Sequence, residues 1–141
     1  KYIDTDSEIE KYLGMNIETI FSNYGESYFR KIEEKICLEV LDNENCVISF
    51  GGGSILNNLV RKKIKKKTLS IYLKVDQNIL LKRLSKSNKR PLLKNTDNEK
   101  VIKQLYDKRK KYYNNADLII ENNNHKKMAL QDIFKKIKKY D

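Results

Sequence analysis

An apolar run ends in three consecutive glycines at Cys46-Val47-Ile48-Ser49-Phe50-Gly51-Gly52-Gly53, and this segment is the most informative part of the sequence for the fold class. The apolar run predicts a buried strand. Glycine has no side chain, so the backbone of residues 51–53 can approach a ligand closely. In open α/β sheets, ligands bind at the carboxyl ends of the strands. The triplet is therefore a candidate substrate floor, meaning the backbone surface of residues 51–53 on which a substrate would lie. A plain tight turn is the alternative, since glycine clusters are common at strand ends.

Strand and helix patterns alternate on both sides of this segment. Further strands are expected at residues 2–3, 69–75 and 118–120, and helices at 7–13, 17–24, 26–40, 56–66, 77–84, 99–113 and 127–140. The last helix should place Ala129, Ile133, Phe134 and Ile137 inward. Strands that alternate with helices favour a parallel sheet covered on both faces, within one domain over residues 1–141. The polar stretch 85–98, which holds the only proline, is expected to be a loop.

Composition excludes several classes of protein. No apolar run approaches the roughly 20 residues that span a bilayer. The two cysteines, Cys37 and Cys46, are too few for a disulfide framework and are expected to be small buried hydrophobes. The sequence has one histidine, His125, which argues against a zinc site.

The net charge of +11 raises the alternative of a nucleic-acid-binding module. We favour a solvated surface, because the basic runs alternate with apolar residues and lack interleaved aromatics.

Two carboxylates, Asp4 and Asp6, follow the first predicted strand. Strand residues two apart point to the same side, which would place both carboxylates at the carboxyl edge of the sheet. One could hold Mg²⁺ and the other could accept a hydroxyl proton. The alternative is that Asp6 caps the helix that follows.

Three arginines lie in short motifs. Arg30 and Glu33 are one helical turn apart, and an arginine fork suits a carboxylate ligand; a surface ion pair is the alternative. Arg90 lies in the polar loop, where it could close over a phosphoryl group as an electrostatic clamp. Arg109 lies three residues before Tyr112 on a predicted helix, where a solvated face is the alternative.

In order and spacing, these motifs resemble the shikimate kinase family. The matching segments are residues 4–6, 20–33, 51–53, 90–93 and 109–112, and the resemblance covers essentially the whole chain. It implies an α/β, three-layer P-loop kinase-like fold, with a parallel sheet of strand order 2-3-1-4-5 flanked by helices. It also implies a cytoplasmic enzyme of chorismate and aromatic amino acid biosynthesis. Such an enzyme transfers the γ-phosphoryl group of ATP, with Mg²⁺, to the 3-hydroxyl of shikimate. We expect a monomer with no nucleic-acid or membrane partner.

For the acceptor side, the resemblance implies that the helices at about 7–42 bind the substrate, together with residues further along the chain. Asp6 would bind the shikimate hydroxyls and accept the proton. Arg30 and Arg109 would bind the substrate carboxylate, with Glu33 orienting Arg30. The backbone of Gly52-Gly53 would form the substrate floor.

For the nucleotide side, the resemblance implies that Asp4 helps to hold Mg²⁺. Arg90, in a lid at about 85–98, would contact the ATP phosphates. Arg83, in the preceding helix, would lie near adenine.

One family feature is missing from this sequence. The Gly-x-x-x-x-Gly-Lys-Ser/Thr loop, whose amides and lysine bind ATP phosphates, occurs nowhere in residues 1–141, and the chain begins at Lys1. We expect a chain shortened by roughly 30 residues, the size of one strand–loop–helix unit. The alternative is a non-catalytic shikimate-kinase-like domain that binds a ligand or partner.

Overall fold

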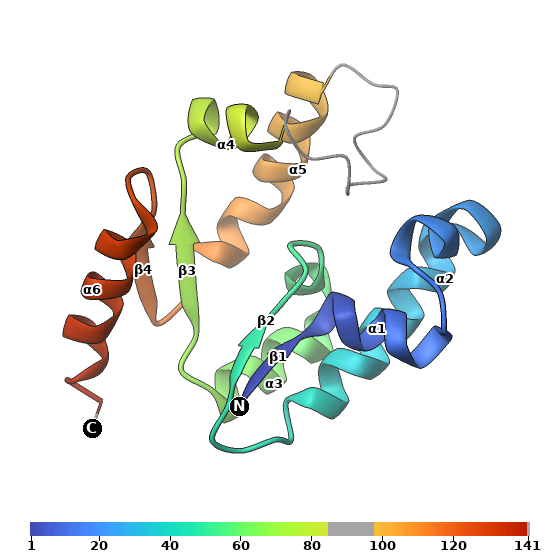
Figure 1. The fold of residues 1–141 in the computed structure, drawn as a ribbon, viewed down its shortest axis with the longest axis horizontal. Helices are drawn as coiled ribbons and strands as arrows, with labels where there is room; N and C mark the ends of the chain where they lie inside the picture. Colours follow the sequence, from blue (N-terminus) through green and yellow to red (C-terminus); the bar gives the residue numbers. More distant parts are fainter. Residues whose placement is uncertain (85–97, 141) are drawn as a thin grey trace. The chain divides into compact units, whose positions relative to one another are not determined.

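The computed structural model describes residues 1–84 and 98–140, in which parallel strands alternate with helices (Figure 1). The elements are β1 (Tyr2–Asp4), α1 (Thr5–Leu13), α2 (Ile17–Val40), β2 (Val47–Ser49), a 3₁₀ turn (Ser54–Leu56), α3 (Asn58–Lys67), β3 (Ile71–Lys74), α4 (Gln77–Leu84), α5 (Asn98–Tyr113), β4 (Leu118–Glu121) and α6 (Lys126–Ile137). This alternation confirms the α/β class. The described residues form two compact units, 1–68 and 69–84 with 98–140. The single domain over 1–141 stays a prediction.

The first unit is built around β1 and β2, which pair in parallel with Ile3 opposite Ile48. Helices α1 and α2 bury Ile9, Ile20 and Phe29 in one apolar cluster with Ile3. A second cluster, of Cys37, Leu41 and Val60, packs α3 against the carboxyl-terminal half of α2. The core therefore fixes α2 beside the carboxyl end of β2, where the glycine triplet begins.

Helix ends in this unit follow the local sequence. Asn16 caps α2 by accepting a hydrogen bond from the Thr19 amide at 2.8 Å. Gly25 interrupts α2 with φ 77° and ψ 173°, a backbone conformation that is essentially restricted to glycine. The expected break is confirmed, and a new helical segment starts just before Glu26 and Arg30.

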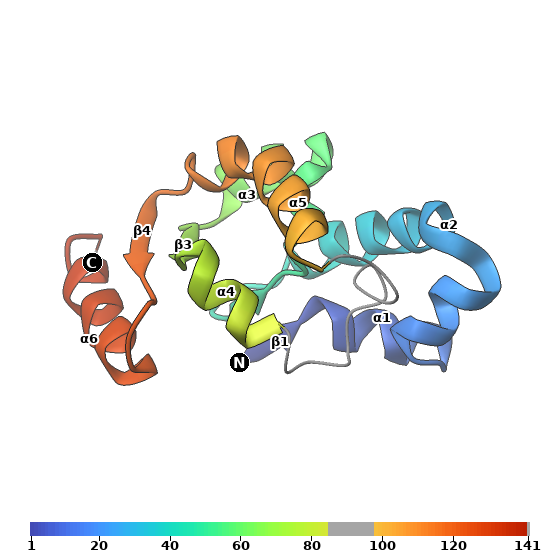
Figure 2. The ribbon, with the colours of Figure 1, turned by 90° about the horizontal axis from the view of Figure 1, so that it is seen from above.

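The second unit contains β3 and β4, which pair in parallel with Tyr72 opposite Ile119. The Tyr72 ring stacks on Tyr113 of α5 with 4.9 Å between ring centroids. Helix α6 lies against β4 (Figures 1 and 2). Lys136 Nζ donates to the Ile119 carbonyl at 3.1 Å. In the expected strand order 2-3-1-4-5, strands 2 and 3 are neighbours, and so are strands 4 and 5. With β1 counted as the second strand of that order, the pairs β1–β2 and β3–β4 agree with it.

The sequence misplaced several features of burial and helix boundaries; Cys46, expected to be buried, is only partly buried. Strand β2 is not buried: Val47 is 69% exposed, since among the described residues β2 pairs with β1 alone. Phe134 is 65% exposed, whereas Ala129 faces inward as expected. The first helix starts at Thr5, two residues earlier than expected. Within residues 1–84 and 98–140, no helix is long and apolar enough to cross a membrane.

Candidate acceptor site

The glycine triplet lies directly against the charged side chains of α1 and α2. The Gly51 amide donates to the buried Thr5 hydroxyl at 3.1 Å. A Cβ atom on Gly51 would come within 2.8 Å of Asp6 Oδ1, and one on Gly53 within 2.7 Å of Arg30 Cζ. With glycine at these positions the side chains lie directly against the backbone, so the backbone and the two charged groups share one surface. The plain-turn interpretation does not account for this packing.

Arg30 is held by two carboxylates of its own helix. Its Nη1 donates to Glu33 Oε2 at 2.7 Å, and its Nη2 and Nε donate to Glu26 Oε1 at 3.0 and 3.2 Å. Burial alone would lower the pKa of the Arg30 guanidinium, but the hydrogen bonds and charges of Glu33 and Glu26 outweigh it and raise that pKa. Of the five N–H groups of an arginine, three make these hydrogen bonds. Two N–H groups of Arg30 take no part in these three hydrogen bonds.

Glu33 is not part of a surface ion pair, because it is only 4% exposed. Its second oxygen, Oε1, accepts a hydrogen bond from Ser54 Oγ at 2.9 Å, and Ser54 is 1% exposed. A buried carboxylate needs partners for its charge, and this one has a cation on one oxygen and a hydroxyl on the other. The expected role of Glu33 in orienting Arg30 agrees with this geometry.

The two aspartates lie on different elements, which corrects the strand geometry expected for them. Asp4 ends β1, whereas Asp6 lies in the first turn of α1. Asp4, not Asp6, caps the helix: its Oδ1 accepts from the Ser7 amide at 3.0 Å. The capping alternative for Asp6 is therefore wrong, and the Asp6 carboxylate faces Gly51 instead.

The remaining predicted residues belong to the second unit or lie outside the described residues. Arg109 is half-buried on α5, and its buried Nε finds no acceptor within residues 1–84 and 98–140. A wholly solvated face does not fit that burial. Arg83 is exposed on α4. Arg90 lies outside the described residues, as does the predicted lid up to the start of α5 at Asn98. The structure thus brings together Asp6, Arg30, Glu33 and the glycine triplet, within the first unit.

Sequence reasoning missed two polar residues of this site, Thr5 and Ser54. Both are buried, and each connects the glycine segment to a helix. The available signal was position alone, since Thr5 lies between the aspartates and Ser54 directly follows the triplet. Cys37 is fully buried one turn after Glu33, as expected, and burial above all raises the pKa of its thiol to about 12.

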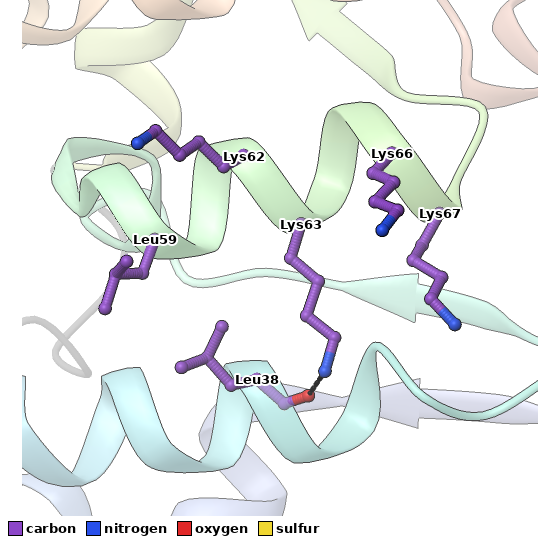
Figure 3. Close-up of a pocket in the computed structure, with 6 residues that line it drawn as sticks. All are labelled: Leu38, Leu59, Lys62, Lys63, Lys66 and Lys67. Atoms are coloured by element: carbon purple, nitrogen blue, oxygen red, sulfur yellow. Dashed lines mark hydrogen bonds between the residues drawn. The ribbon is translucent and has the colours of Figure 1, made fainter.

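A separate cavity of about 370 Å³ lies between α2 and α3 (Figure 3). It is lined by Leu38, Leu59, Lys62, Lys63, Lys66 and Lys67. Lys63 Nζ donates to the Leu38 carbonyl at 2.7 Å and pairs with Asp42, which fixes α3 to the end of α2. None of the predicted site residues lines this cavity, so it is not the acceptor site.

Comparison with known proteins gives one consistent result. The family model described as "Shikimate kinase" matches residues 1–140. A shikimate kinase of Bartonella henselae is 34% identical over 99% of this chain and 67% of its own length. A shikimate kinase of Mesorhizobium japonicum is 36% identical over 92% of this chain and 64% of its own length. A solved shikimate kinase from Acinetobacter baumannii, in complex with shikimate, is 29% identical with a TM-score of 0.92, over 99% of this chain and 79% of that chain.

These matches, together with the α/β fold and the site formed by Arg30, Glu33 and the glycine triplet, place the chain among the small-molecule kinases. The chain spans about two thirds of the length of the curated relatives that it matches. It belongs to the shikimate kinase family.

Proposed function

We propose that this chain provides the shikimate-binding part of an ATP-dependent shikimate kinase. The observation that carries the proposal is Arg30, fixed by Glu33 and lying against Gly53, with Asp6 against Gly51. Shikimate is a small polyol with one carboxylate, so it requires a bidentate cation and acceptors for hydroxyl groups. The shikimate bound to the Acinetobacter baumannii relative supports the same ligand here.

The carboxylate of shikimate would bind to the N–H groups of Arg30 that Glu26 and Glu33 leave available. Arg109 would be the second cation, since its buried Nε lacks an acceptor among the described residues. The backbone of Gly52-Gly53 would form the floor beneath the ring. Holding the substrate by both ends places its hydroxyl for in-line attack, which is most of what phosphoryl transfer requires of a protein.

Asp6 would accept a hydrogen bond from the attacking hydroxyl and take up its proton as the new O–P bond forms. The bond between the γ-phosphorus and the β–γ bridging oxygen of ATP breaks in the same transfer, and ADP leaves. The position of its carboxylate against the Gly51 backbone suits this role, because the side chain lies beside the floor. A positioned carboxylate of this kind contributes as a general base or by orienting the hydroxyl.

The nucleotide would use Asp4, Arg83 and Arg90. Asp4 is a single carboxylate, and no cluster of three or more His, Cys, Asp or Glu able to hold a metal occurs within residues 1–84 and 98–140. That donor set fits Mg²⁺, which usually binds through one or two carboxylates and the phosphates of its nucleotide. Bound Mg²⁺ would neutralise charge on the transferred phosphoryl group. Arg90 would contact the phosphates and Arg83 would lie on the adenine side.

The test is shikimate binding by calorimetry together with shikimate-dependent ADP release, in the wild type and in Arg30→Lys. We expect Arg30→Lys to weaken shikimate binding at least about tenfold, because lysine cannot reproduce a planar fork. The matched control is Arg61→Lys on α3, whose Nη1 donates to the carbonyls of Ile55 and Leu56. Equal losses in both variants, or no shikimate binding by the wild type, would refute the assignment.

The same measurements separate the enzyme from a non-catalytic shikimate-kinase-like domain. Shikimate binding with no ADP release supports the binding domain, and binding with release supports the kinase. We further propose a monomer that acts in the cytoplasm without nucleic acid. Light scattering after gel filtration tests the monomer, and filter binding with a salt titration tests the absence of nucleic-acid affinity.

A further inference from the structure

We propose that Ser54 is a positioning residue for shikimate, acting through Glu33 on Arg30; the inference rests on the proposed function. Ser54 Oγ donates to Glu33 Oε1, and Glu33 Oε2 accepts from Arg30 Nη1. The three side chains form one continuous chain of hydrogen bonds, with Ser54 and Glu33 both buried. Ser54 does not need to touch the substrate to affect its binding.

The Ser54 hydroxyl fixes the rotation of the Glu33 carboxylate. Because Glu33 is buried, an Oε1 atom without a donor would seek another partner, and the Arg30 guanidinium already donates to the other oxygen of the same carboxylate. A carboxylate turned in that way would draw a second N–H group from Arg30. The guanidinium would then have fewer N–H groups for a ligand and would point in a different direction.

Ser54 also connects the glycine segment to the arginine. Its amide donates to the Gly51 carbonyl at 3.0 Å, while its hydroxyl reaches Glu33. A Cβ atom on Gly51 would come within 3.3 Å of the same Glu33 Oε1, so the backbone packs closely on this carboxylate. The floor and the carboxylate-binding arginine are therefore held at a fixed separation by one serine. That separation sets the distance that a ligand must have between its carboxylate and its hydroxyl groups.

The test is Ser54→Ala, measured by shikimate calorimetry alone and in the Arg30→Lys background. We expect about a tenfold rise in the shikimate Kd from Ser54→Ala alone, an unchanged KM for ATP, and less than a twofold further effect on top of Arg30→Lys. The matched control is Ser70→Ala, which removes a hydroxyl that donates to Asp117 in the second unit. Ser54→Ala effects of equal size in both backgrounds would overturn the proposal, because Ser54 would then act independently of Arg30.

A second readout needs no substrate. The Arg30 Nε–H resonance of ¹⁵N-labelled protein reports the hydrogen bonds of this guanidinium. A guanidinium turned toward Glu33 would pull its Nε–H away from Glu26. We therefore expect severalfold faster solvent exchange at Arg30 Nε–H in Ser54→Ala, with the amide spectrum of α1 and α3 unchanged. If the wild type fails to bind shikimate, the proposed function falls and this resonance alone decides the role of Ser54. An unchanged Arg30 signal refutes it.

Discussion

Substituting Gly53 by alanine should damage the site while leaving the fold intact. Gly53 has φ −89° and ψ −24°, which any residue can adopt, so alanine introduces no backbone strain. The added Cβ atom would lie 2.7 Å from Arg30 Cζ and 2.8 Å from Nη2. Non-bonded atoms need about 3.5 Å, so the guanidinium must move by roughly 0.8 Å or more. The tip of a flexible side chain can move that far, but its 2.7 Å hydrogen bond to Glu33 cannot persist unchanged.

The size of the effect follows from the displaced guanidinium, which would lose its hydrogen bond to the carboxylate of shikimate. A hydrogen bond between charged groups contributes about 1.5–3 kcal/mol, which corresponds to roughly a 10- to 150-fold loss of shikimate affinity. Calorimetry measures the affinity. A urea melt measures the fold, whose free energy of unfolding should fall by no more than the roughly 1.5–3 kcal/mol of the perturbed Arg30–Glu33 hydrogen bond. The converse control is Gly14→Ala: φ is 66° and the site around its Cβ is open, so alanine there should cost about 1 kcal/mol of stability and leave shikimate binding unchanged. Wild-type affinity in Gly53→Ala would refute the reasoning.

Three further predictions concern other parts of the chain. Arg109→Lys should raise the KM for shikimate far more than that for ATP, because a bidentate contact is lost; equal increases would argue against the role. Gly25→Ala should destabilise the protein by about 1–3 kcal/mol in a urea melt, since φ 77° with ψ 173° suits glycine alone, and a wild-type midpoint would contradict the cause. Burial raises the pKa of the Cys37 thiol from 9.0 to about 12, so an aromatic disulfide reagent at pH 8 should modify the half-exposed Cys46 and not Cys37. Because the pKa of the Cys37 thiol is higher in the folded state than in the unfolded state, its contribution to stability is complete below pH 9 and is lost as the pH rises toward 12. Over this pH range the free energy of unfolding should fall more in the wild type than in Cys37→Ala.

Local sequence signals predicted the elements of the fold where the cause is itself local. Asn16 and Gly25 act on their neighbouring residues through one hydrogen bond or one dihedral angle, so their effects could be inferred from the sequence. Asp4 shows the limit: both Asp4 and Asp6 suit a helix cap, and the choice depends on where pairing with β2 ends β1. Periodicity also placed Phe134 inward, yet α6 contacts β4 through a narrower face that contains Ala129.

The candidate site could be predicted only in part. Spacing along α2 relates Arg30 to Glu33, because residues three apart share a helix face. Nothing local relates either residue to Ser54, which is 21 positions from Glu33 and meets it only after α2 packs beside the glycine segment. Such contacts depend on tertiary packing, and a single polar residue after the triplet carries no periodicity that would indicate burial.

The two carboxylates on Arg30 have a consequence for which ions can bind there. Glu26 and Glu33 contribute two negative charges against one positive charge, so these three side chains together carry −1 although the whole chain carries +11. Simple anions such as chloride or acetate gain little from such a group, because the two glutamates offset the charge of the arginine. A carboxylate would bind only if it also brought hydroxyl groups for the floor and met a second cation, the part proposed for Arg109. The site would thereby discriminate against the abundant small anions of its surroundings.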